Sequence, residues 1–158
     1  MAIHRLLVND FYDDTYTLIA IHSRLEDYRL AYLLNKNLGL KLKRKAKDLD
    51  VEYVTASYSI FEWKNETHYE TWNLVSNLCK KEENRLQSAG LLFDDEKNLK
   101  IHHLISEFKN VDFFIKISNE VQDVNEKAIL KTLQTISQII TSYTVNPLKI
   151  KSKDHLIF

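Results

Sequence analysis

Glycine and proline are scarce in this chain, and that scarcity limits the loops it can build. The 158 residues include two glycines and one proline, where average usage would give about eleven and about eight. Glycine-rich phosphate loops, dinucleotide-binding fingerprints and nucleophile elbows each need two or more glycines at short spacing. Gly39 and Gly90 lie far apart, so the sequence excludes these three motifs, and we expect no cofactor.

Composition is that of one globular unit, with 44% hydrophobic and 28% charged residues. We therefore expect a single domain over residues 1–158. Twenty-two basic residues balance 22 acidic ones, so no overall field favours DNA. The longest apolar runs, such as Leu18–Ile21, are too short for a membrane helix, and Cys79 has no disulfide partner in the chain. These features predict a cytoplasmic protein that binds neither DNA nor membrane.

The first predicted elements are a strand followed directly by a helix. Residues 15–22 are rich in Thr, Tyr, Ile and Leu and predict a central strand with apolar side chains on both faces. Ser23 and Glu26 have the spacing of a capping box, so we expect a helix from there to about Leu38, ended by Gly39. Its apolar stripe at helical spacing includes Tyr28 and Tyr32.

Further strands and a second helix follow. We predict a hairpin from residues 56–63 and 67–77, a loop over 80–88, a second hairpin from 91–93 and 100–105, a strand over 111–117, and a helix from Asp123 to about Tyr143. Asn146 and Pro147 end that helix, and residues 148–158 are a final strand or tail. The result is an α+β fold: an antiparallel sheet of about six or seven strands with two main helices packed on one face.

One segment resembles a known family signature. Residues 105–113 are similar to the signature of the IPExxxVDY family of small bacterial proteins, known mainly from Bacteroidota, with matches at Ile105, Glu107, Val111 and Asp112. Ser106 and Phe113 depart from the pattern, which has proline and tyrosine there. The stretches 16–23 and 26–35 also resemble the start of that family. The resemblance implies no activity, ligand or catalytic residue, so no functional role is carried over.

The highest density of positive charge lies in the segment 41–47. It contains five basic residues, Lys41, Lys43, Arg44, Lys45 and Lys47, and a strand would place the four lysines on one face. Such a patch can bind phosphates of RNA or another polyanion. The alternative is a solvated edge strand, because edge lysines protect a sheet against edge-to-edge aggregation.

Aromatic residues gather on the first predicted hairpin, namely Tyr58, Trp63, Tyr69 and Trp72. Some of these rings are expected to complete the core. The period-2 pattern nevertheless leaves aromatics on both faces, and an exposed aromatic face is a natural protein interface. We therefore expect a protein partner or self-association through this hairpin.

Catalytic and metal-binding patterns are absent from the sequence. The six histidines show no metal-ligand spacing, and His102 and His103 are adjacent, so a strand would point them to opposite faces. Cys79 has no neighbouring histidine in the sequence. We therefore expect a non-catalytic interaction or adaptor protein without a metal. The alternatives are an RNA- or ribosome-associated protein that uses residues 41–47, and an enzyme whose site only the fold assembles.

Overall fold

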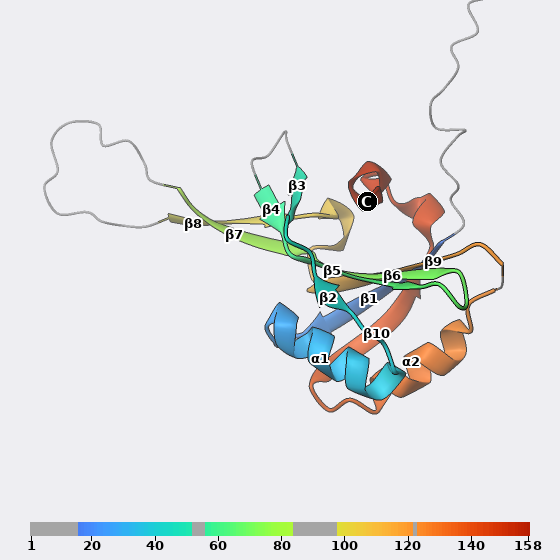
Figure 1. Ribbon diagram of the computed structural model, residues 1–158. Helices are drawn as coiled ribbons and strands as arrows, with labels where there is room; N and C mark the ends of the chain where they lie inside the picture. The colour runs from blue at the N-terminus through green and yellow to red at the C-terminus, as the bar shows by residue number, and fades with distance from the viewer. Residues whose placement is uncertain (1–15, 52–55, 84–97, 122) are drawn as a thin grey trace, which may run out of the picture.

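The computed structural model describes residues 16–51, 56–83, 98–121 and 123–158 (Figure 1). Its main element is a six-stranded antiparallel sheet with strand order β10-β1-β9-β6-β5-β2. These strands are β1 (Tyr16–Ser23), β2 (Lys43–Arg44), β5 (Ile60–Asn65), β6 (Glu70–Ser76), β9 (Phe113–Asn119) and β10 (Ile139–Val145). The predicted α+β class with an antiparallel sheet is confirmed.

Two helices and several shorter elements complete the described part of the chain. The helices are α1 (Asp27–Leu38) and α2 (Glu126–Gln134). Two small sheets pair β3 (Leu49–Val51) with β4 (Ala56–Tyr58) and β7 (Leu78–Glu83) with β8 (Asn98–His103). Three 3₁₀ turns are η2 (Ser106–Phe108), η3 (Pro147–Lys149) and η4 (Lys153–Leu156).

The sheet separates two apolar layers because successive residues of a strand face opposite sides. Ile19 and Ile21 of β1 pack with Leu30 of α1 and Leu133 of α2 in one buried cluster. Both helices thus cover the same face of the sheet, as predicted (Figure 1). Leu18, on the other face, belongs to a second cluster.

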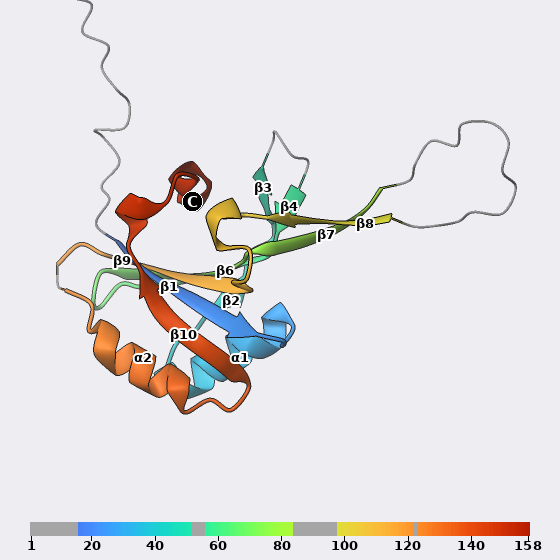
Figure 2. The ribbon, with the colours of Figure 1, turned by 180° about the vertical axis from the view of Figure 1, so that it is seen from behind.

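The second face is covered by short elements instead of long helices. Its buried cluster includes Tyr58 from β4, Ile105 before η2, and Ile150 and Leu156 from the carboxy-terminal turns. Figure 2 shows η2 and these turns above the sheet, on the side opposite the helices. The predicted strand or tail over 148–158 is therefore a pair of 3₁₀ turns that folds back over the sheet.

The first helix starts later than predicted. Ser23 ends β1, where its hydroxyl donates to the carbonyl of Gln138 at 2.9 Å, and the helix begins at Asp27. Glu26 occupies the N-cap position without a side-chain capping bond, so the predicted capping box is wrong. Gly39 does end the helix, with a left-handed φ of 67° that favours glycine.

The second helix is shorter than predicted, because its carboxy-terminal part is a strand. The α2 helix ends at Gln134, and Asn125 caps it by accepting from the N–H of Ala128. Residues 139–145 form β10, which pairs with β1. Isoleucines spaced three and four apart fit either element, and the β-branched residues of 139–145 favour the strand once β1 offers a partner.

The first predicted hairpin is confirmed for β5 and β6, but residues 56–58 of its predicted first strand form β4, which pairs with β3. The second predicted hairpin is wrong in its pairing. Strands β5 and β6 pair from Ile60↔Val75 to Asn65↔Glu70. Residues 78–83, of which 80–83 were predicted as loop, form β7, and the partner of β7 is β8. Residues 84–97, including the predicted strand 91–93, lie outside the described residues. The β7–β8 ribbon projects from the body of the protein (Figures 1 and 2).

None of the helices that the structure describes is long and apolar enough to span a membrane.

Candidate functional site

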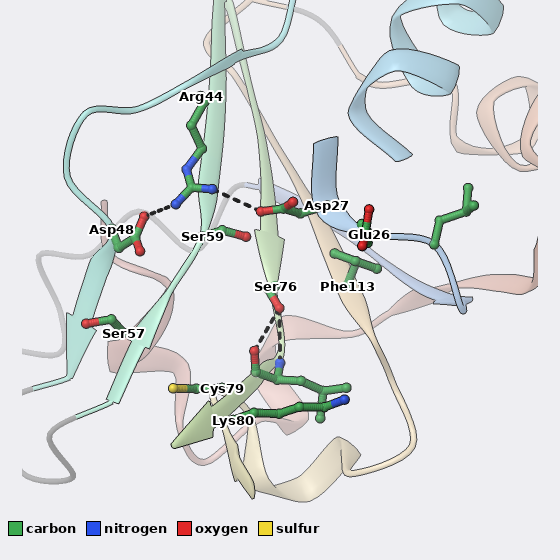
Figure 3. A pocket seen from close by; sticks show the side chains of 12 residues that line it. Glu26, Asp27, Arg44, Asp48, Ser57, Ser59, Ser76, Cys79, Lys80 and Phe113 are labelled. Atoms are coloured by element: carbon green, nitrogen blue, oxygen red, sulfur yellow. Dashed lines mark hydrogen bonds and ion pairs between the residues drawn. The ribbon is translucent and has the colours of Figure 1, made fainter. Parts of the chain in front are cut away.

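A polar pocket of about 370 Å³ opens where the amino-terminal end of α1 meets β2, β4 and β7. Figure 3 shows its lining, which is Leu25, Glu26, Asp27, Arg44, Asp48, Ser57, Ser59, Ser76, Leu78, Cys79, Lys80 and Phe113. This pocket brings together a cysteine, a lysine, an arginine, carboxylates and hydroxyls. The hydrogen bonds and ion pairs among these lining residues determine which of their polar groups are free to bind a ligand.

Arg44 is held between two carboxylates in this pocket (Figure 3). One guanidinium nitrogen donates to Asp27 at 3.0 Å, and another donates to Asp48. The Ser76 hydroxyl donates to the carbonyl of Leu78 at 2.9 Å. Because these polar groups bond to one another, the pocket braces α1 against β2 and presents no free arginine fork to an anion.

An apolar groove of about 490 Å³ lies between α1 and Gln138, the residue before β10. It is lined by Leu25, Tyr28, Arg29, Tyr32, Leu33 and Gln138. Tyr28 and Tyr32, one helical turn apart, are 56% and 64% exposed. The Arg29 guanidinium lies 6.0 Å from the centre of the Tyr28 ring. The groove therefore combines tyrosines and an arginine, the residue types that contribute most to binding energy in protein interfaces.

Helical spacing predicts that these two tyrosines belong to the apolar stripe of the helix. The residues that α1 buries are Leu30, Ala31 and Leu34, which form a narrower stripe than the sequence suggests. Helical spacing shows which side chains of α1 point in the same direction. It does not show how wide the neighbouring surface is that buries them. The available signal is the residue type, because tyrosine is less often fully buried than leucine.

The aromatic residues of the β5–β6 region are divided between the core and the surface. Tyr58 and Trp72 are buried, and Trp72 lies opposite Trp63, which packs against the helix-side core. Tyr69, in the hairpin turn, is 64% exposed and has a φ of 53°. Tyr58 and Trp72 are thus not available on the surface, and the hairpin does not offer a continuous aromatic face.

The basic segment lies at the edge of the large sheet, since β2 is the last strand in the order. Arg44 is used by Asp27 and Asp48, and the Lys45 ammonium lies 3.5 Å from Glu62. Lys41, Lys43 and Lys47 are exposed. No ion pair joins these three lysines to a residue that the structure describes.

Histidines do not gather into a metal centre. Across the described ranges, no group of three or more His, Cys, Asp or Glu side chains is placed to hold a metal ion. His22 Nε2 lies 3.2 Å from the Tyr143 hydroxyl, and His155 Nδ1 lies 2.7 Å from the carbonyl of Leu104. His102 lies directly across from Cys79 in the β7–β8 ribbon, a proximity that the sequence does not reveal.

The residues that resemble the IPExxxVDY signature have structural roles. The Glu107 carboxylate accepts hydrogen bonds from the N–H groups of Lys151 and Ser152 and from the Ser152 hydroxyl, at 2.7 to 2.9 Å. Burial raises the pKa of Glu107, but hydrogen bonds from its own backbone and from these donors outweigh burial and hold the pKa below its ordinary value. Asp112 accepts from the N–H of Ser23 at 2.9 Å.

Asn77, which sequence analysis did not single out, connects the signature to β7. Its amide donates to the carbonyls of Phe108 and Val111 and accepts from the N–H of Ile105, all within 2.9 Å. Val111 itself is buried in the cluster on the sheet face away from the helices. These contacts position the turn before β9, the end of β1 and the carboxy-terminal turns, and they involve Ile105, Glu107, Val111 and Asp112.

A scan of protein-family models and searches of curated proteins and solved structures found no match to this chain. The similarity of residues 105–113 to the IPExxxVDY signature therefore stays an expectation from the sequence. The function must be inferred from the surfaces described above.

Proposed function

We propose that this protein is a non-catalytic interaction or adaptor protein that binds a partner protein through the α1 groove, lined by Leu25, Tyr28, Arg29, Tyr32, Leu33 and Gln138. The observation that carries the proposal is the exposure of Tyr28 and Tyr32 beside Arg29 on one side of a well-packed helix. Tyrosine and arginine are enriched in protein interfaces, so their grouping along one apolar groove favours an interaction site.

The occupant is a short segment of another protein that presents apolar side chains beside a carboxylate. Leu25, Leu33 and the tyrosine rings supply the apolar walls. Arg29 is the charged residue of the lining, and its contact with Glu26 is long, at 3.8 Å, between side chains that are both about two-thirds exposed. Such a surface pair contributes little, so a partner carboxylate can replace Glu26 and form a bidentate bond with the guanidinium.

The polar pocket supports binding over catalysis. Its arginine is committed to two carboxylates, and the Ser57 hydroxyl donates to Asp50. An enzyme needs a nucleophile or base that is oriented toward an open position for the substrate. The contacts in the pocket join its own walls instead.

A second candidate is an RNA-associated role, favoured by the exposure of Lys41, Lys43 and Lys47 at one sheet edge. Lys45 and Arg44 already pair with acidic residues, which leaves few charges for phosphates. Counterion release scales with the number of phosphates contacted, so this surface would bind RNA weakly.

A displayed library of random peptides, selected against the native chain, tests the proposal. Enriched peptides should contain apolar residues and an Asp or Glu, and Tyr32→Ser should weaken their binding by roughly 30-fold, because truncating a central aromatic costs about 2 kcal/mol. Tyr69→Ser is the matched control, because Tyr69 and Tyr32 are both 64% exposed. The proposal fails if no peptide is enriched, or if Tyr69→Ser abolishes binding and Tyr32→Ser does not.

The same preparation distinguishes the RNA-associated role. Fluorescence anisotropy with a labelled single-stranded RNA should give no saturable binding at moderate salt. Binding that falls steeply with salt and is lost on Lys43→Glu would favour the RNA role over the peptide groove.

A further inference from the structure

The two edges of the large sheet differ in how they are protected. The β2 edge is two residues long and consists of Lys43 and Arg44. The β10 edge is seven residues long, with the sequence Ile-Ile-Thr-Ser-Tyr-Thr-Val, and contains no charge, glycine or proline. Short, charged edge strands resist pairing with another chain, whereas long uncharged ones invite it.

The outer side of β10 is open within the part of the chain that the structure describes. No described strand pairs with it on the side away from β1. Ile140, Thr141, Tyr143 and Thr144 are exposed, and Ile140 lies at the register shift between His22 and Ser23. An edge strand leaves the N–H and C=O groups of every second residue without a strand partner.

Ser142, at the midpoint of β10, adds an independent observation. Its side chain is 9% exposed, and its hydroxyl has no hydrogen-bond partner among the described residues. It faces the helix side of the sheet, because it lies opposite Ile21 in the register with β1. A buried hydroxyl without a partner is destabilising, so this strand carries an unsatisfied hydrogen-bonding group at its centre.

From these features we infer that β10 pairs antiparallel with β10 of a second copy of this chain, about a two-fold axis at Ser142. In that register Ser142 lies opposite the partner's Ser142, and Thr141 lies opposite the partner's Tyr143. Directly opposed residues have Cβ atoms about 5 Å apart, close enough for two serine hydroxyls to hydrogen-bond. The pairing joins the two sheets into one continuous sheet and gives the central hydroxyl its partner.

A second copy fits this edge better than an unrelated segment does. A two-fold axis needs a strand that is compatible with itself, and β10 meets this requirement because it brings no like charges together. The inference does not rest on the α1 groove: Tyr28 and Tyr32 lie on α1, although the groove also includes Gln138, the residue before β10.

Sedimentation velocity of the native chain over a range of concentrations tests the inference. We expect a dimer that Thr144→Lys converts to a monomer, because Thr144 is exposed and a lysine there places a charge without a partner in the strand pairing, opposite Ile140 of the second copy. The matched control is Thr67→Lys, an exposed threonine in the β5–β6 turn, which should leave the dimer intact. Circular dichroism and thermal melting are the checks that both variants fold.

A cross-link tests the register. Ser142→Cys in a Cys79→Ser background should form a disulfide-linked dimer under mild oxidation, and Thr67→Cys in the same background should not. A chain that is monomeric at every concentration, or a dimer that persists with Thr144→Lys, overturns the inference. So does a dimer that Thr144→Lys dissociates but Ser142→Cys fails to cross-link, since it would not have the two-fold axis at Ser142.

Discussion

Lys116 is a buried charged residue that lies between Leu18 of β1 and Asn73 of β6 in the large sheet. It lies on β9 opposite Leu18, and its ammonium donates to the carbonyl of Leu156 at 2.6 Å. The same nitrogen lies 4.9 Å from the centre of the Tyr16 ring and 4.7 Å from that of Phe158. No carboxylate of the described residues forms an ion pair with it. Lys116 thus holds the carboxy-terminal turns on the sheet through a carbonyl and two rings.

Burial lowers the pKa of Lys116 below its ordinary value of 10.5. Between the two values the unfolded chain holds a proton that the folded chain has lost, so stability rises with pH across that window. We expect the free energy of unfolding of the wild type to increase with pH relative to Lys116→Met, which lacks this titration. Urea denaturation at a series of pH values measures the difference, and a difference that stays constant with pH would contradict the prediction.

Tyr58 has a pKa raised to about 12, by burial first and by the negative charge of the Cys79 thiolate second. We expect the tyrosinate absorbance of the native chain to show a late step near pH 12 that Tyr58→Phe removes. Rapid mixing records the spectra before the chain unfolds. Cys79→Ser should move the step to lower pH, because it removes the nearby negative charge. Coincident curves for wild type and Tyr58→Phe would show that Tyr58 ionises with the exposed tyrosines.

The raised pKa of Tyr58 changes stability with pH in the opposite direction to the lowered pKa of Lys116. Above pH 10 the unfolded chain loses the Tyr58 proton while the folded chain keeps it, so the folded state binds more protons and stability falls as pH rises. Comparing each variant with the wild type separates the two contributions, because each substitution removes one titration.

At the scale of elements, Asn77 joins segments that are distant in sequence. Its amide bonds the N–H of Ile105 and the carbonyls of Phe108 and Val111, while its own backbone N–H donates to the carbonyl of Asp112 at 2.9 Å. The side chain is fully buried. It therefore fixes the turn that carries η2 between β8 and β9.

We expect Asn77→Ala to lower the free energy of unfolding by about 3 kcal/mol, because it removes three buried hydrogen bonds and leaves their backbone partners unsatisfied. Asn73→Ala is the control. Asn73 is equally buried, but its amide makes one long contact, 3.4 Å, with Glu62. Equal losses in the two variants, measured by chemical denaturation, would show that volume and not hydrogen bonding decides the cost.

The sequence predicts correctly those helix ends and hairpins that are determined by residues close together in the chain. The end of α1 followed from Gly39, and the β5–β6 hairpin followed from two alternating segments around a polar turn. Long-range pairing decided the rest. Strand β7 carries Lys80–Glu83 and has no apolar periodicity, so only its partner β8 makes it a strand. Isoleucine spacing likewise fits a helix at 139–145 until β1 is placed beside it.

The candidate site was less accessible to sequence reasoning than the fold, for the same physical reason. Helical spacing predicts Tyr28 and Tyr32 in the apolar stripe of the first helix, and the aromatic hairpin predicts Trp72 among its candidate interface residues. In the fold, the exposed tyrosines are Tyr28 and Tyr32, and Trp72 is 6% exposed. Which aromatic residue is covered depends on the width of the opposing layer, and that width is set by elements distant in the chain.

At the scale of the whole molecule, charge is concentrated at one edge of the sheet and absent from the other. Lys43 and Arg44 form the β2 edge, whereas β10 has no charged residue. An assembly through β10 would therefore leave the basic segment at the two far ends of a continuous sheet. Self-association and any binding of a polyanion would then involve opposite edges and should respond differently to salt.

We expect the sedimentation coefficient of the native protein to be unchanged by ribonuclease and by sodium chloride, because the β10 pairing buries backbone groups and uncharged side chains. Screening by salt weakens attraction between charges and has little effect on such a surface. Ammonium sulfate should strengthen the association, since it favours burial of apolar area. Sedimentation in each condition, with Thr144→Lys as the monomer reference, measures this. A fast-sedimenting complex that dissociates on addition of ribonuclease or sodium chloride would contradict this prediction. It would require an electrostatic assembly on RNA, with the exposed lysines Lys41, Lys43 and Lys47 as its contacts.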